Sequence, residues 1–406
     1  MEVLYERCCG IDVHSRIIVA CVRVGRKNEI REFGAYTRDL LELAEWLKET
    51  KCMMVAMEST GVYWKPLMNI FEMEEISAIV VNAQHMRSLP GRKTDIKDAE
   101  WIADLLQHGL LRASFIPDKE MRELRDLLRY RKSKTEERTR EINRLQKFLE
   151  GANVKLTETI SDINGVAGRK LLNLLIQDKP IRIEDIAANR DGRLKATSED
   201  LLKACEGHFS ALQRELVQEV IRNIDTLNQS IERLEEMVDR YLSDSYSDSA
   251  KRLEKIPGIG EASSQVIVAE TGIDMSRFPS ADHFCSWAGL SPGNNQSAKK
   301  RKNSKTNKAN KTLKTTMIQC ARSAVKNKDS YFYAQYQRLV VRRGANKAIV
   351  AVAHSMMIAV YHVLSGEEFV DLGSNYYNQF NRERKINSLL KQLEKLDYPI
   401  TLVVPA

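Results

Sequence analysis

One amphipathic segment constrains the fold of this chain more than any other. Between residues 217 and 241, apolar side chains recur at alternating intervals of three and four residues. The series is Val217, Val220, Ile224, Leu227, Ile231, Leu234, Val238 and Tyr241. This is the spacing of a coiled-coil seam, so it predicts a long helix whose apolar stripe must be covered by another helix.

Two helices are available to cover this seam: the segment 121–149 of the same chain, or the 217–241 helix of a second subunit. The frame of the segment 121–149 is apolar at both ends, at Leu124, Leu128, Ile142, Leu145 and Leu149. Its middle positions include Arg131 and Arg138, which disfavour a purely hydrophobic seam. We therefore expect the 217–241 helix to pair with a second subunit.

The first hundred residues alternate between strand-like and helix-like runs. The strand-like runs are RCCGIDV, RIIVACVRV, EIREFGAYT, CMMVAMES and ISAIVVNA, and the helix-like runs are LLELAEWLKET and VYWKPLMNIFEME. Strands rich in β-branched residues, followed by alternating β and α segments, predict an α/β sheet with helices packed on it.

The length of 406 residues indicates two or three domains. We expect an α/β domain at 1–117 and a helical coiled-coil connector at 118–245, and the segment DSYSDSA after the coiled-coil helix is typical of a linker. A mainly helical domain follows at 246–366. The tail, 367–406, contains the helix-like KINSLLKQLEKL.

Charge points to a polyanionic partner. The net charge is +8, and no Asp or Glu occurs from His283 to Lys328. The lysine run SAKKRKNSKTNK in this stretch would neutralise phosphates without reading sequence. The residues expected to bind nucleic acid are Lys299, Lys300, Arg301, Lys302, Lys305 and Lys308. A disordered basic tract is the alternative.

Cysteine usage and the N-terminus indicate a soluble cytoplasmic protein. The seven cysteines are odd in number and form no CxxC pair, which argues against a disulfide framework or a zinc site. MEVLYERCCG does not have the pattern of a signal peptide. The apolar run AIVAVAHSMMIAVYHVL contains histidines and is too short for a convincing membrane span.

Four carboxylates occupy positions suited to binding a metal ion. Asp12 and Glu58 lie at the ends of strand-like runs, and Asp95 and Asp98 open a helix. Positions i and i+3 of a helix share one side, so all four can converge on one or two Mg²⁺ ions, which prefer oxygen ligands. The alternative for Asp95 and Asp98 is ordinary capping, with Thr94 as the N-cap.

The sequence IPGIG, between helix-like segments, predicts a helix-hairpin-helix turn. Gly258 and Gly260 would let backbone N–H groups approach a DNA phosphate. A tight turn without a ligand is the alternative reading.

The segments GIDVHS, AMESTG and KTDIKDAEWIADLL resemble the motifs of the insertion-sequence one-ten family of bacterial transposases. The resemblance implies a RuvC-like (ribonuclease-H-like) N-terminal domain with a DEDD tetrad. The tetrad falls at Asp12, Glu58, Asp95 and Asp98, which would bind Mg²⁺.

The run WAGLSPGNNQSAKKRK is similar to the family's serine loop, and Ser297 falls at the position of the catalytic serine. The glycine that usually follows this serine is Ala298 here, which departs from the family pattern. Ser291 and Ser304 are weaker candidates for the nucleophile.

The resemblance implies a transposase or site-specific recombinase that cuts and rejoins the double-stranded DNA of element ends and target. It also implies a transient phosphoserine link, an element-encoded guide RNA, and a homo-oligomer (dimer or tetramer) located with the prokaryotic nucleoid. Two alternatives stay open. A RuvC-like structure-specific nuclease of the Holliday-junction type would form no covalent serine intermediate, and a non-catalytic nucleic-acid-binding protein would be indifferent to Mg²⁺.

Overall fold

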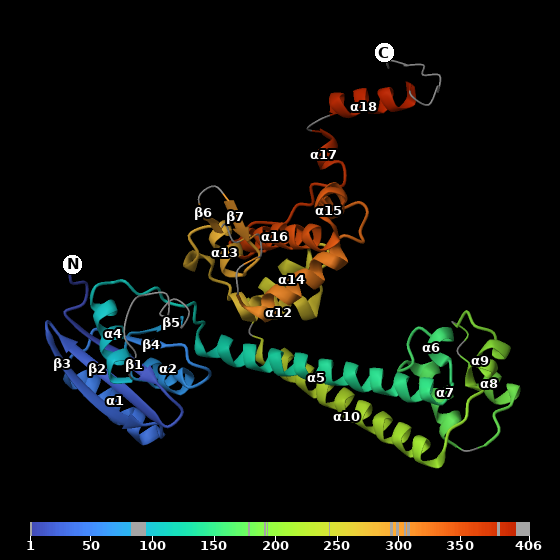
Figure 1. The fold of residues 1–406 in the computed structure, drawn as a ribbon, viewed down its shortest axis with the longest axis horizontal. Coiled ribbons are helices and arrows are strands. Elements are labelled where there is room, and N and C mark those ends of the chain that lie inside the picture. Colours follow the sequence, from blue (N-terminus) through green and yellow to red (C-terminus); the bar gives the residue numbers. More distant parts are fainter. Residues whose placement is uncertain are drawn as a thin grey trace. The chain divides into compact units, whose positions relative to one another are not determined.

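A computed structural model describes residues 2–82, 95–177, 179–190, 192, 194–242, 244–292, 295–297, 300–303, 306, 309–379 and 382–394. The chain divides into two compact units, residues 1–119 and 120–406 (Figure 1). Each unit is described by itself.

The first unit is built on a mixed five-stranded sheet. Its strands are β1 (Arg7–Val13), β2 (Ile17–Val24), β3 (Lys27–Gly34), β4 (Met54–Glu58) and β5 (Ala78–Val81), and its helices are α1 (Thr37–Glu49), α2 (Trp64–Met73) and α4 (Asp95–Gln107). The strand order is β3-β2-β1-β4-β5. The first three strands are antiparallel hairpin neighbours, whereas β1, β4 and β5 are parallel because helices connect β3, β4 and β5. The sequence prediction of an α/β sheet is confirmed.

Helices cover both faces of this sheet. Alternate residues of β1 and β4, such as Ile11 and Met57, point into a core formed with α1 and α2. The intervening residues, such as Cys8 and Ala56, pack against α4. The sheet is therefore buried on both sides, and any polar residue on its α4 face lies between the strands and a helix.

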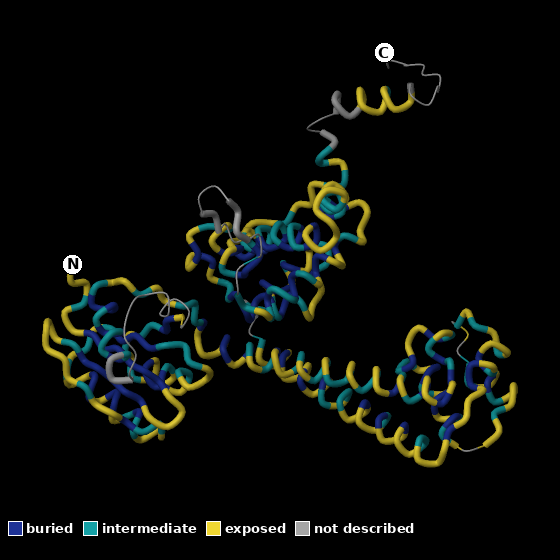
Figure 2. The backbone as a smooth tube through the Cα atoms, viewed as in Figure 1, coloured by how far each residue is buried: buried dark blue, intermediate teal, exposed yellow. Residues whose placement is uncertain are grey.

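The second unit begins with two long helices, α5 (Lys119–Gly151) and α10 (Ala211–Tyr241), which lie side by side (Figure 1). Between them along the chain come α6 (Leu156–Thr159), α7 (Val166–Ile176), α8 (Ile183–Asn189) and α9 (Ser198–Cys205). Six of the eight predicted seam positions of α10 are buried: Val217, Val220, Ile224, Ile231, Leu234 and Val238 (Figure 2). Leu227 is only partly buried, and Tyr241, at the end of the helix, is 49% exposed.

The preference for a second subunit as the partner of this seam is wrong. At one end Leu145 and Leu149 of α5 join the same core as Val217. In the middle, Arg138 Nη1 donates to Asn228 Oδ1 at 3.1 Å. A hydrogen bond from Nη1 thus accommodates part of this guanidinium, although its Nε is buried without a hydrogen-bond partner among the described residues.

The rest of the second unit is mainly helical. Its helices are α11 (Asp244–Glu254), α12 (Glu261–Thr271), the 3₁₀ turn η1 (Met275–Arg277), α13 (Ala281–Trp287), α14 (Lys311–Ala324), α15 (Tyr331–Arg343), α16 (Ala345–Leu364), α17 (Tyr376–Gln379) and α18 (Arg382–Glu394). A short antiparallel hairpin, β6 (Asn295–Ser297) and β7 (Lys300–Asn303), interrupts them. The linker predicted at DSYSDSA is wrong, because these residues begin α11, whose Ala250 and Leu253 are buried.

Helix α16 is long and apolar enough to cross a membrane, the one such helix within the described ranges. Its 20 residues show that the expectation of a run too short to span was wrong as to length. Half of the stretch is buried inside the protein, where it contacts α11, α13, α14 and α15. This packing is that of a core helix.

Candidate functional site

The first candidate residue, Asp12, lies near the end of β1 and is only 6% exposed. Strand alternation places it on the same face as Gly10, which is the face covered by α4. His14 Nε2 lies 3.0 Å from its Oδ2. A carboxylate at such a position is costly unless it is hydrogen-bonded, paired or bound to a cation.

Glu58 is the last residue of β4, the parallel neighbour of β1. The register pairs Ile11 with Met57, so Asp12 and Glu58 are the next residues on the two strands. Neighbouring strands lie about 4.8 Å apart. Because Ala56 faces α4, alternation puts Glu58 on that face as well. The two carboxylates thus share one edge and one face of the sheet.

Helix α4 approaches this edge with its N-terminal end. A Cβ on Gly10 would lie 2.3 Å from the carbonyl oxygen of Ala99 and 2.3 Å from the nitrogen of Ala103. Cys8, earlier on β1, contacts Ala103 through its thiol. The helix therefore runs opposite to β1, and its first turn, with the half-buried Asp98, lies toward Asp12. Asp95 begins the helix, but its side chain lies outside the described residues.

The chemistry of these donors fits Mg²⁺, because carboxylate oxygens are the ligands it prefers. Among the side chains that the structure describes, Asp95 excluded, no group of three or more His, Cys, Asp or Glu side chains is arranged to hold a metal ion. Asp12 and Glu58 on the strands and Asp98 on α4 are the described residues that would supply such a site.

Sequence reasoning did not single out His14. It lies in the turn between β1 and β2, and its side chain is about half exposed. The signal was present in the sequence, because a polar residue two positions after Asp12 continues the face that Gly10 and Asp12 share. Its ring is one of the groups that hold Asp12 in place.

The predicted glycine turn joins α11 to α12, as the helix-hairpin-helix reading requires. Gly258 has φ +88°, and a Cβ there would lie 2.4 Å from the Cys320 carbonyl of α14. Packing against α14 thus accounts for this glycine without a ligand. Gly260 is exposed and is the N-cap residue of α12.

Ser297 ends β6 and pairs with Lys300 of β7. The described parts of the segment read as a loop, 295–297 and 300–303, are therefore paired strands, and Pro292 and Thr306 form a further bridge. Lys299, Lys305 and Lys308 lie outside the described residues, as do the side chains of Ser297, Lys300, Arg301 and Lys302.

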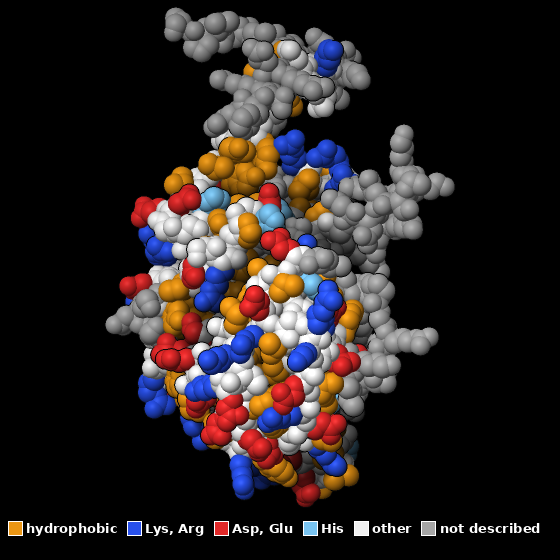
Figure 3. Space-filling model, turned by 90° about the vertical axis from the view of Figure 1, so that its left-hand side faces the viewer, with side chains coloured by type: hydrophobic (Ala, Val, Ile, Leu, Met, Phe, Trp, Pro, Cys, Tyr) orange, Lys and Arg blue, Asp and Glu red, His pale blue; other side chains and the backbone are white. Residues whose placement is uncertain are grey.

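Charge on the surface in view gives no further guide to a nucleic-acid site. In the space-filling view of Figure 3, the basic and acidic side chains drawn in colour are interspersed.

Comparison with known families matches both units. Residues 9–154 match a family model described as transposase, of the DEDD type of IS110. Residues 250–337 match a family model described as transposase, IS116/IS110/IS902 family. Together the two ranges cover more than half of the chain. No curated protein matches the sequence.

Proposed function

Because the chain belongs to the IS110 family of transposases, we propose that it cuts and rejoins DNA strands with a Mg²⁺-binding carboxylate site and a serine nucleophile. The observation that carries this proposal is the parallel register of β1 and β4, which sets Asp12 beside Glu58 on the face that α4 covers. We assign this unit to a RuvC-like fold with a DEDD tetrad, in which Asp95 and Asp98 complete the set.

The carboxylates would hold and orient the cation. Asp12 and Glu58 are fixed by strand register, and Asp98 by the packing of α4 on Gly10. When bound, Mg²⁺ would stabilise the charge on the phosphate oxygens and on the leaving oxygen. A serine hydroxyl is a weak nucleophile unless a base, a metal or nearby cations lower its pKa. The basic run Lys299–Lys302, which follows Ser297 closely in sequence, would supply such cations.

The serine chemistry conserves the bond energy of the phosphodiester that is cut. Ser297 Oγ attacks phosphorus and loses its proton, a P–Oγ bond forms, and the bond to the departing sugar oxygen breaks. That oxygen takes up a proton. A strand-end hydroxyl then attacks the phosphoserine and the steps run in reverse, so rejoining needs no other energy source.

The other parts of the proposal concern partners and organisation. The lysine run binds the DNA backbone of element ends and target, while an element-encoded guide RNA selects sequence by base pairing. We assign residues 1–117 to the metal site, 118–245 to the connector, 246–366 to the serine site and 367–406 to a tail. The active form is a homo-oligomer, soluble and located with the nucleoid.

A covalent trap tests this proposal. Purified protein, Mg²⁺, DNA carrying its element's end and the adjacent transcript are incubated and denatured, and protein attached to DNA is quantified. Ser297→Ala abolishes the adduct, whereas Ser291→Ala and Ser304→Ala retain it. Mg²⁺-dependent cutting with no adduct would instead favour the structure-specific nuclease.

A further inference from the structure

A buried carboxylate outside the proposed tetrad lies in α12. Glu270 is only 1% exposed. It is the one charged residue of the segment VIVAETG. An ionised carboxylate at such a site requires full pairing. Its partners come from two other parts of the second unit.

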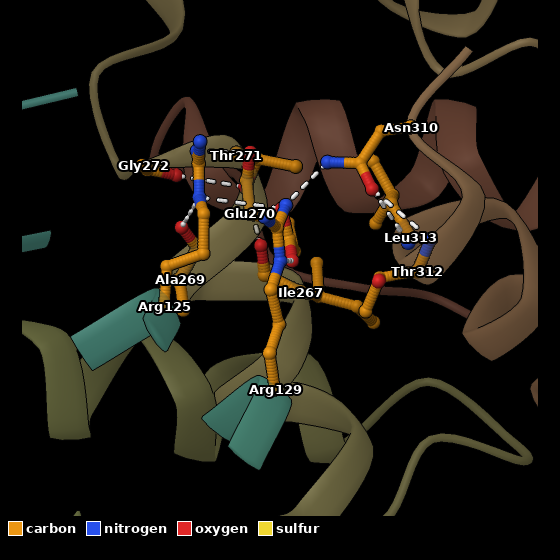
Figure 4. A network of polar contacts seen from close by, with 10 residues as sticks. All are labelled: Arg125, Arg129, Ile267, Ala269, Glu270, Thr271, Gly272, Asn310, Thr312 and Leu313. Carbon is orange, nitrogen blue, oxygen red and sulfur yellow. Dashed lines mark hydrogen bonds and ion pairs between the residues drawn. The ribbon is translucent and has the colours of Figure 1, made fainter. Parts of the chain in front are cut away.

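The first partners are two arginines of α5 (Figure 4). Arg129 donates to both carboxylate oxygens of Glu270, at 2.8 Å each, in a bidentate pair. Arg125 binds the carbonyls of Ala269 at 3.1 Å and of Glu270 at 3.0 Å, and its Nε lies 3.3 Å from Glu270 Oε2. Paired guanidiniums in this geometry are among the strongest polar contacts in proteins. They fix α5 to the C-terminal end of α12.

The other partner is Asn310, at the start of α14. Its Nδ2 donates to Glu270 Oε2 at 2.5 Å (Figure 4). Its Oδ1 accepts from the backbone N–H groups of Thr312 and Leu313, at 3.1 and 3.2 Å, as the N-cap of α14. One side chain therefore both caps a helix and anchors the cap to Glu270.

Asn310 stands at the base of the hairpin that carries Ser297. On the N-terminal side of Asn310, Thr306 bridges to Pro292. On the other side, Lys314 of α14 donates to the Thr306 hydroxyl. The start of α14 thus contacts the Pro292–Thr306 bridge, which flanks the β6–β7 hairpin in sequence, and Glu270 holds the start of α14.

We infer that Glu270 is a positioning residue for Ser297, and that the path from Arg129 through Glu270 to Asn310 makes the placement of the hairpin depend on the seating of α5 against α12. The inference rests on the proposed serine chemistry. The Glu270 carboxylate is buried but the Arg129 side chain is 43% exposed, so the contacts to Arg125 and Asn310 are those least weakened by salt.

Asn310→Asp separates this role from simple helix capping. Aspartate is as good an N-cap as asparagine, so the bonds from Thr312 and Leu313 are kept. The donor to Glu270 is removed, and two carboxylates face each other. We expect the adduct with DNA to form at least about tenfold more slowly, the equivalent of one missing charge-assisted hydrogen bond, with DNA affinity unchanged. Amide hydrogen exchange of residues 295–303 should quicken.

Restoration of the adduct rate in a double variant is the more specific test. In the double variant Glu270→Gln with Asn310→Asp, the amide and carboxylate exchange places and a hydrogen bond can form again. We expect the double variant to recover part of the adduct rate and of the exchange protection that Asn310→Asp removes. Additive losses in the double variant would instead show that the Glu270–Asn310 hydrogen bond is not what links the two residues to the adduct rate.

The α5 end of the path has a matched control. Arg129→Ala should slow adduct formation and loosen the hairpin, whereas Arg140→Ala, an exposed arginine of the same helix, should change neither. If Arg129→Ala unfolds, Arg129→Lys keeps the charge but removes the bidentate geometry, and it serves in its place.

The outcomes separate this inference from the proposed function. Absence of the adduct in wild-type protein would contradict the serine chemistry, while hydrogen exchange would still report on the hairpin. Unchanged exchange of residues 295–303 in both Asn310→Asp and Arg129→Ala would overturn the positioning role. So would a normal adduct rate in both variants when the wild type forms the adduct.

Discussion

Gly10 of β1 lies in direct backbone contact with Ala103 of α4. A Cβ added at Gly10 would be 2.3 Å from the Ala103 nitrogen, a separation that packed atoms cannot adopt. Because the opposing atoms are backbone, no side-chain rotation relieves the clash. The contact sets how closely the helix that carries Asp98 approaches the strand that carries Asp12.

Gly10→Ala should therefore displace α4. We expect a loss of about 1–3 kcal/mol in the free energy of unfolding, as for an overpacked core, together with a reduced affinity for Mg²⁺. Denaturant unfolding and a Mg²⁺ titration of cleavage measure the two effects. Gly151→Ala is the control, since nothing lies within 4 Å of a Cβ there. Equal stability of the two variants would show that the contact does not constrain α4.

The sheet face on which each candidate carboxylate lies was predictable from sequence, but the pairing of β1 with β4 that sets Asp12 beside Glu58 was not. Their role as metal ligands stays a prediction. Strand alternation and the helical i, i+3 spacing place Asp12, Glu58 and Asp98 from short segments alone. The coiled-coil partner was not predictable in this way. Arg131 and Arg138 looked incompatible with an intrachain pair because their acceptors, Gln265 and Asn228, lie far along the chain.

For the same reason, neither the partners of Glu270 nor the helical start of α11 could be predicted from the sequence. A single Glu in an apolar run gives no indication of arginines more than a hundred residues away. In DSYSDSA the polar composition favours a linker, yet Ser249 and Ala250 are buried once the helix packs. In both cases tertiary contacts outweigh the local pattern.

Asp98→Asn should abolish strand cleavage and leave DNA binding intact, because it removes a metal ligand and almost no volume. Cleavage at increasing Mg²⁺ and a binding titration measure the two properties. Asp104→Asn is a matched change on the same helix, at an acid that pairs with Arg23 at 2.9 Å. It should retain cleavage. Undiminished cleavage by Asp98→Asn would rule out the metal role.

Ile224→Ala tests which helix covers the coiled-coil seam. Ile224 is fully buried, so its truncation should cost about 2–5 kcal/mol of unfolding free energy. Since α5 of the same chain covers the seam, the destabilisation should not depend on protein concentration. The exposed Asn223 next to it provides a control, Asn223→Ala. A destabilisation that becomes smaller at high protein concentration would show that the seam lies at a subunit interface.

His354 of α16 should make the protein less stable in mild acid. Burial lowers the pKa of its imidazole, and the Asp282 carboxylate opposes this only in part. The unfolded chain takes up a proton near the ordinary value of about pH 6.5, whereas the folded chain does so only at lower pH. Stability from the neutral ring is therefore complete above that value and is lost as pH falls toward the folded pKa.

Chemical unfolding at about pH 7.5 and about pH 5.5 measures this dependence, which spans the ordinary histidine pKa. The difference in unfolding free energy between the two conditions should be smaller in His354→Asn than in the wild type. His208→Asn, at an exposed histidine, should leave that difference as it is. An equal acid sensitivity of His354→Asn and wild type would exclude His354 as its source.

Lys299, Lys300 and Lys302 should contact the DNA backbone without reading sequence. Their joint replacement by Ala should weaken binding and lower the slope of log affinity against log salt by about 2–3, because each lysine that neutralises a phosphate contributes about one to that slope. Affinity measured across a salt series gives this slope. The exposed lysines Lys170, Lys195 and Lys203 provide a charge-matched triple control. An unchanged slope in the first variant would mean that the run does not touch phosphate, and an equal decrease in both would indicate a general charge effect.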